Sequence, residues 1–83
     1  MPPRFYFDLR RDGEVIVDDE GEELDSVERA EEMAIEVATS AARDQFVDAS
    51  PDPLIVAVRD ASGRQVVRVT LALKVEHPDR PRR

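Results

Sequence analysis

The sequence predicts an α+β domain in the order ββαββ, with one helix packed on one face of a four-stranded antiparallel sheet. Three observations predict this fold. Apolar and polar residues alternate in four short segments, which is the period of a half-buried strand. Turns that contain glycine join these segments in pairs. Between the two pairs, a longer segment carries apolar side chains at helical spacing.

The first pair of strands is predicted over residues 5–10 and 14–18. In the opening strand, Phe5, Phe7 and Leu9 point to one face and their neighbours to the other. Asp12 and Gly13 supply turn chemistry, because aspartate favours turns and glycine accepts positive φ without steric cost. This pattern is typical of a hairpin.

The helix is predicted from Ser26 to about Phe46. We expect Asp25 to be its N-cap, because Glu28 follows three residues later as in a capping box, and Ser26 is the alternative cap. The residues expected on its buried face are mostly small and allow close approach to a sheet. They are Val27, Ala30, Ala34, Val37, Ala38, Ala41 and Ala42.

The second pair of strands is predicted over residues 54–59 and 64–75, around a turn with Gly63 in the left-handed region. Pro51 and Pro53 exclude a continued helix before this hairpin. The face toward the helix is expected to carry Phe5, Phe7, Leu9, Val56, Val58, Val67, Val69, Leu71, Leu73 and Val75.

The 83 residues are expected to form one domain over residues 1–75, followed by a disordered tail rich in proline and arginine at residues 76–83. There is no cysteine, which excludes disulfides and thiolate metal sites. No apolar stretch reaches the ~20 residues that span a bilayer. We therefore predict a cytoplasmic protein that does not enter a membrane.

Motifs for catalysis, metal binding or phosphate binding are not evident. The acidic run from Asp18 to Glu23 lacks the ligand spacing of an EF-hand loop. The single histidine, His77, lies in the predicted tail without an orienting partner. The three glycines stand apart, so no glycine-rich phosphate loop exists. We predict no enzymatic activity, no metal and no cofactor.

Charge is unevenly distributed along the chain, whose formal net charge is −7. Ten acidic residues and one arginine lie between Asp18 and Glu36, so the remainder carries a slight excess of bases. The net charge opposes general affinity for nucleic acid, which favours clustered lysine and arginine. A role for the stretch from Asp18 to Asp25 beyond capping and solubility stays open.

The sheet face opposite the helix has no cover within the predicted fold, and its residues mix apolar, aromatic and basic side chains. We consider three interpretations: an ordinary solvated face, an interface for a second copy or a protein partner, and a platform for single-stranded nucleic acid. We favour a non-enzymatic interaction module that homodimerises or docks a protein partner, with RNA binding as the alternative. The residues proposed to carry binding are Tyr6, Arg10, Ile16, Ile55, Arg59, Arg64, Val66 and Arg68.

A family resemblance covers about residues 3–73. The segments that carry it are the opening strand from Pro3 to Leu9 with Asp12-Gly13, the spacing Asp18-x-x-Gly21-x-x-Leu24, the helix alanines, and Val58-Arg59-Asp60-x-x-Gly63-Arg64. Together they resemble a family of short bacterial proteins that usually open P-R-Y-F-F and form a domain of unknown function. The resemblance implies a small bacterial cytoplasmic domain of this architecture and no catalytic residues.

Overall fold

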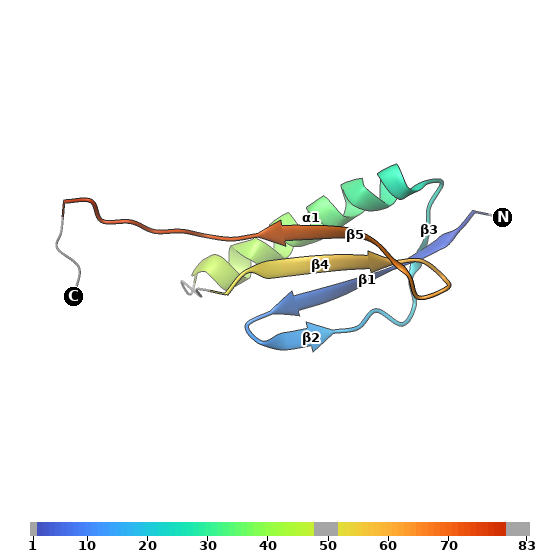
Figure 1. Cartoon of the computed structure of the whole chain (residues 1–83), viewed down its shortest axis with the longest axis horizontal. Helices are drawn as coiled ribbons and strands as arrows, with labels where there is room; N and C mark the ends of the chain where they lie inside the picture. Colours follow the sequence, from blue (N-terminus) through green and yellow to red (C-terminus); the bar gives the residue numbers. More distant parts are fainter. Residues whose placement is uncertain (1, 48–51, 80–83) are drawn as a thin grey trace.

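One α-helix packs on one face of an antiparallel sheet in a computed structural model that describes residues 2–47 and 52–79. Figure 1 shows the elements in chain order, with the helix behind the sheet. The strand order across the sheet is β2-β1-β4-β5, and a further short strand, β3, pairs with β1. The predicted α+β class and the ββαββ plan are confirmed, and β3 is an addition that the sequence pattern did not indicate.

The first hairpin joins β1 (Arg4–Arg11) to β2 (Glu14–Ile16). Asp12 and Gly13 have φ values of 50° and 79°, the conformation of a two-residue type I′ turn, and Arg11 pairs with Glu14. The second strand was expected to reach Asp18 but ends at Ile16. Beyond that point the chain turns away, and Asp18 contacts β1 through its side chain.

The short strand β3 (Glu22–Glu23) pairs with the start of β1, where Phe5 lies opposite Glu22. Because alternate residues of an antiparallel strand direct their backbone groups to opposite edges, Phe5 and Leu9 use the same edge of β1. β2 and β3 therefore follow one another along that edge. Leu24 then donates its backbone N–H to the carbonyl of Pro3 at 3.0 Å and packs against the core.

The helix α1 (Val27–Val47) begins one residue later than expected. The Ser26 hydroxyl accepts a hydrogen bond from the N–H of Arg29 at 3.2 Å, so Ser26 is the N-cap and the prediction of Asp25 is wrong. Ala30, Ala34 and Ala38 are fully buried, whereas Val27, expected on the same face, is exposed at the first turn. Residues 48–51 of the predicted loop after the helix lie outside the described residues.

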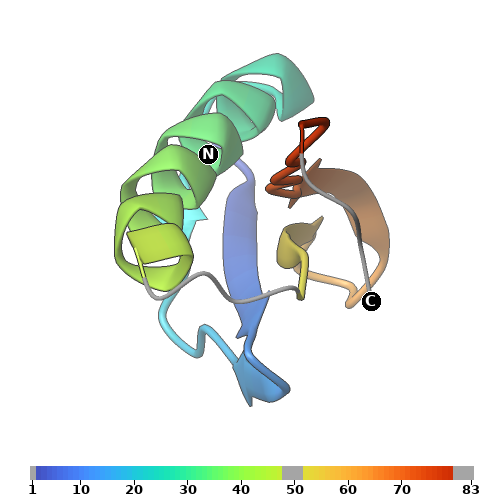
Figure 2. The ribbon, with the colours of Figure 1, turned by 90° about the vertical axis from the view of Figure 1, so that its left-hand side faces the viewer.

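The core lies between the helix and the two central strands. β4 (Leu54–Arg59) contributes three buried side chains, Leu54, Val56 and Val58, and β1 contributes Phe5. The helix packs mainly on β4 and β5 and only lightly on β1. Figure 2 shows the helix on one side of the sheet. Gln45, which the apolar pattern did not single out, is buried at the end of the helix and donates Nε2 to the carbonyl of Asp52 at 2.6 Å.

The second hairpin joins β4 to β5 (Gln65–Leu71) through a loop organised by Asp60. The Asp60 carboxylate accepts hydrogen bonds from the N–H groups of Ser62 and Arg64, and Gly63 has a φ of 89°, as expected for this turn. The Val58/Val67 pair is followed by Arg59 opposite Gln65, so the register shifts there and leaves Val66 at a β-bulge.

The last strand is shorter than predicted. It was expected to reach Val75 but ends at Leu71, because Leu71 pairs with Leu54, the first residue of β4, and no strand among the described residues lies beside the chain beyond that point. Residues 72–77, which we name the arm, continue away from the domain in the direction of β5 (Figure 1). Leu73 and Val75, expected to face the core, are exposed. The tail predicted to be disordered extends to residues 80–83, outside the described residues.

Candidate interaction surface

The sheet face opposite the helix, named here the outer face, is defined by the strand register. Phe7, Val58 and Val67 pair in one row and pack on the helix side. The intervening rows therefore point outward, since side chains alternate along a strand. These rows are Tyr6 with Arg59, then Asp8 with Ala57 and Arg68, then Val15 with Arg10, Ile55 and Thr70.

An ion pair occupies one end of the outer face. Arg59 donates Nε to Oδ2 of Asp8 at 2.8 Å and Nη2 to Oδ1 at 3.3 Å. The Arg59 guanidinium also lies over the Tyr6 ring, 4.7 Å from its centroid. The hydrogen bond that Arg59 donates to Asp8 raises the pKa of Arg59, so the guanidinium stays charged. The charge of Arg59 is therefore paired, and one face of the Tyr6 ring is covered, by contacts within the domain.

Asp18 joins this ion pair to the edge of β1. Its carboxylate accepts hydrogen bonds from the N–H groups of Phe7, Glu20 and Gly21 at 3.0–3.1 Å. Its own N–H donates to Asp8, and its carbonyl accepts from Arg59 at 2.6 Å. Between β2 and β3, the Asp18 side chain thus accepts from Phe7 the hydrogen bond that a neighbouring strand would otherwise accept.

The pKa of the Asp18 carboxyl reflects these contacts. Desolvation by burial raises its pKa, but the N–H donors of Phe7, Gly21 and Glu20 outweigh that effect, and the charge of Arg59 acts in the same direction. The pKa of Asp18 is therefore lowered below its usual value of 3.8. Asp18, the first residue of the acidic run, is therefore an acceptor of backbone hydrogen bonds within the fold.

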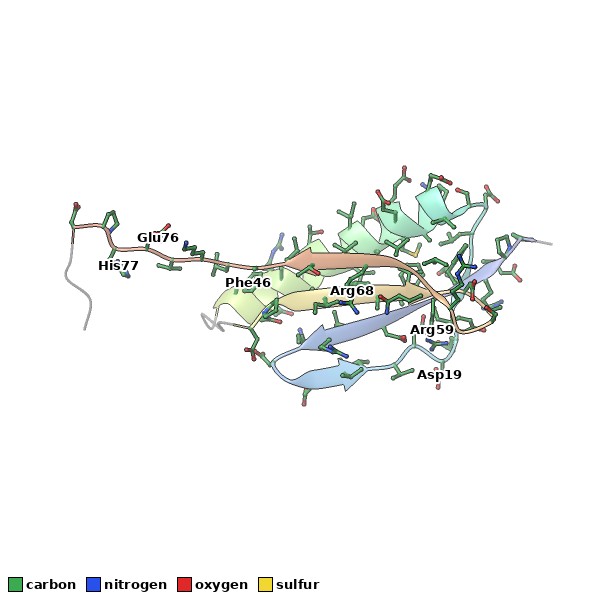
Figure 3. The ribbon with its side chains drawn as sticks, in the orientation of Figure 1. Asp19, Phe46, Arg59, Arg68, Glu76 and His77 are labelled. Carbon is green, nitrogen blue, oxygen red and sulfur yellow. The ribbon has the colours of Figure 1, made fainter. Side chains whose placement is uncertain are left out.

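In the same region, the backbone of Gly21 lies very close to β1. Its φ is 76°, and a Cβ at this position would lie 2.9 Å from Arg4 Cγ, from the carbonyl oxygen of Phe5 and from Tyr6 Cε2. Glycine is therefore required both by conformation and by space. The Tyr6 ring therefore lies close both to this backbone segment and to Arg59, which Figure 3 labels at this end of the sheet.

Five of the eight residues predicted to bind a partner lie on the outer face: Tyr6, Arg10, Ile55, Arg59 and Arg68. The outward placement predicted for two of the other three, Ile16 and Val66, is wrong. Ile16 pairs with Leu9 and shares its face, because the two-residue turn sets Val15, and not Ile16, beside Arg10. The bulge turns Val66 so that it packs against the core cluster. Arg64 precedes β5 and belongs to the loop. The binding role of all eight stays a prediction.

Two cations on the outer face are free of ion pairs within the described residues. Arg10 is exposed and makes no hydrogen bond in this part of the chain, and Arg68 donates only to the Gln65 side chain at 3.2 Å. Ile55 and Ala57, both half-buried, lie between them. What the domain leaves for a partner is therefore an apolar centre with a cation on either side.

A hollow lies on the helix side, between α1 and β1. It is an open groove of about 490 Å³, and Leu9, Met33, Val37 and Ala41 form its apolar floor. Arg11, Glu36, Ser40 and Asp44 form its rim. The groove exists because the helix packs on β4 and β5 and leaves β1 half covered. The sequence did not indicate it, because its residues come from a helix flank and a strand whose relative placement no periodicity defines.

Residue types that could bind a metal do not gather in the described ranges, where no group of three or more His, Asp or Glu side chains is placed to hold an ion. His77 lies exposed on the arm (Figure 3). No described helix is long and apolar enough to cross a membrane.

A family model described as a domain of unknown function (DUF6894) matches residues 4–72, which include every strand and the helix. No curated protein and no solved structure matches the chain.

Proposed function

This chain belongs to the DUF6894 family, a domain of unknown function, and on that premise we propose that it is a non-enzymatic interaction module that docks a protein partner on its outer face. One observation carries the proposal. Ile55 and Ala57 form an apolar centre that none of the described elements covers, between Arg10 and Arg68, which form no ion pair within the described residues.

The composition of this surface resembles that of protein interfaces. Arginine is enriched at interfaces, where it supplies several hydrogen-bond donors around an apolar contact. Because Asp8 is already neutralised by Arg59, the surface offered to a partner is positive. The partner that fits is an acidic segment with an apolar side chain at its centre, and an acidic surface of a second copy is one example.

The nucleic-acid alternative has less support. A single-stranded nucleic acid needs an open aromatic face for stacking and cations for its phosphates. Arg59 already covers one face of Tyr6, and Asp8 pairs with that arginine. Two cations remain on the outer face, and RNA binding stays a prediction without a specific observation in its favour.

Site-specific photo-crosslinking tests the proposal. A photoreactive side chain replaces Ile55 on the outer face, and in a matched control it replaces Glu32, which is exposed on the outer side of the helix. In the cell that makes the protein, we expect a discrete protein adduct from position 55 and none from position 32. Combining the probe with Arg10→Glu and Arg68→Glu should remove the adduct.

Mass spectrometry of the adduct separates the variants of the proposal. A second copy of this chain in the adduct would support homodimerisation through the outer face, and another protein would support docking. An adduct that contains RNA would favour the alternative. Equal labelling from both positions, or no adduct from position 55, would overturn the proposal.

A further inference from the structure

The outer edge of β5 has no neighbour among the described residues. β5 is the last strand in the sheet order, and its other side pairs with β4 along its whole length. The arm extends this edge by six residues that pair with nothing in the described chain (Figure 1). An edge of this length displays a row of free N–H and C=O groups, which is a template for another strand.

The arm keeps the apolar period of the strand. Val67, Val69 and Leu71 point to the helix side and are half-buried, and the same alternation continues through Leu73 and Val75, which are 45% and 58% exposed. An arm made to remain in water would not need this pattern. It is the pattern of a strand that has one buried face, and the domain provides nothing to bury it.

The helix carries an exposed apolar residue on the same side of the molecule. Met33 and Val37 line the groove toward β1, so the helical period places Ile35 on the opposite flank, toward β5. Ile35 is 46% exposed. The arm and the helix flank toward β5 thus both leave apolar surface exposed.

We propose that a second copy of this chain covers this edge, with the two β5 strands antiparallel about a two-fold axis at Ala72. In this register the arm of each copy lies along β5 of the other. Leu73 lies opposite Leu71, Val75 opposite Val69, and Glu76 opposite Arg68 of the second copy. The contact is isologous, so it closes at two copies.

Charge and apolarity select this register from its neighbours. Opposite charges directly across an antiparallel pair are favourable and like charges are unfavourable. An axis at Leu71 would set Arg68 opposite Lys74. An axis at Thr70 would set Lys74 opposite Val66, which packs into the core, and Val75 opposite Gln65 at the bulge. Of these three axes, only the one at Ala72 sets Arg68 opposite an acidic residue. It also sets every apolar residue of the arm opposite an apolar residue.

The side chains that would form the new ion pair are available. Glu76 lies 3.9 Å from Lys74 in a solvent-exposed contact, and Arg68 bonds only to Gln65. Figure 3 shows Arg68 on β5 and Glu76 far along the arm, so within one chain they do not meet. This inference does not rest on the proposed function. The two share Arg68, but the dimer is argued from the strand edge, the arm and Glu76, whereas docking is argued from Ile55, Ala57 and Arg10 on the outer face.

Charge exchange tests the contact. Sedimentation velocity should show a dimer for the unaltered chain. Arg68→Glu and Glu76→Arg should each weaken self-association by about tenfold or more, since each sets like charges opposite one another twice. An equimolar mixture of the two variants should dimerise again, because each mixed pair restores both attractions. Arg10→Glu, which alters the outer face away from this edge, should leave the dimer unchanged.

A disulfide tests the register independently of the charges. The chain has no cysteine, so Ala72→Cys introduces a single thiol. At the axis, the two Cα atoms would be about 4.5–5.5 Å apart, within disulfide reach, whereas Lys74→Cys places them about 13 Å apart. Under mild oxidation we expect a covalent dimer from position 72 and almost none from position 74. A strictly monomeric chain, a dimer indifferent to both charge variants, or equal crosslinking at both positions would overturn the inference, and none of these results bears on the crosslink from Ile55.

Discussion

The two edges of the sheet differ in what lies along them. On one side, β1 is followed by two strands of three and two residues, and Asp18 bonds the edge between them. On the other side, β5 offers seven residues and an arm without a neighbour among the described residues. Short, interrupted edges are a common protection against unwanted strand pairing. The difference teaches that this domain protects one edge and leaves the other open.

The largest expected effect comes from breaking the protected edge at Gly21. Gly21→Ala adds a Cβ within 2.9 Å of three atoms and demands a positive φ from alanine. We expect the free energy of unfolding to fall by about 2–4 kcal/mol, from strain and overpacking together. Urea unfolding followed by circular dichroism measures this.

Gly13 provides the matched control. Its φ of 79° is nearly the same, but a Cβ there would meet nothing within 4 Å. Gly13→Ala should therefore lose only the conformational part, about 1 kcal/mol. If both variants lost equal stability, the close approach at Gly21 would have no energetic importance.

A smaller effect is expected from the ion pair that anchors the protected edge. Asp8→Ala and Arg59→Ala should each lower the free energy of unfolding by less than Gly21→Ala does, because each removes the hydrogen bonds of the ion pair and leaves the partner bonded only to the backbone of Asp18. In a double-mutant cycle, the combined loss should fall short of the sum by at least about 0.5 kcal/mol, since both changes remove the same contact. Strict additivity would argue against the coupling inferred from the geometry.

The smallest effect is the dependence on pH. Asp18 has a lower pKa in the folded chain than its unfolded value of 3.8, so the unfolded chain binds the proton first as the pH falls. The stability that this carboxylate contributes is complete well above pH 3.8 and is lost as the pH falls through 3.8 toward the folded pKa. Asp18→Asn should be less stable at neutral pH, and the difference from the unaltered chain should shrink in acid.

The comparison of two chains isolates Asp18 from other acids. The loop carboxyl of Asp60 also has a lowered pKa, chiefly from the hydroxyl of Ser62, and it contributes to the acid response in both chains alike. It therefore cancels in the difference between their urea midpoints. A difference that stays constant from neutral to acid pH would contradict the contacts assigned to Asp18.

Local patterns in the sequence predicted the fold class, the faces of β1 and β4, and the turn at Gly63. These predictions are correct because each depends only on the alternation or turn residues of a single segment. Ile16 and Val66 were placed on the wrong face because register depends on the turn and the bulge, which shift the count by one residue. The contacts of Asp18 with Phe7 and Arg59 were not predictable, since they join three segments far apart in the chain. The length of β5 was overestimated because alternation continues past the end of its partner strand.

The place of β1 in the sheet has a consequence for the folding reaction. β1 is a central strand, yet the partner on its inner side lies about fifty positions away, as in the Asp8–Arg59 pair. The helix and both hairpins can form from neighbouring residues, whereas the centre of the sheet forms only when a long loop closes. Such closure carries an entropic cost that local structure does not repay. We therefore expect the union of β1 with β4 to set the rate at which this chain folds, and substitutions at that seam to slow folding more than those in the helix.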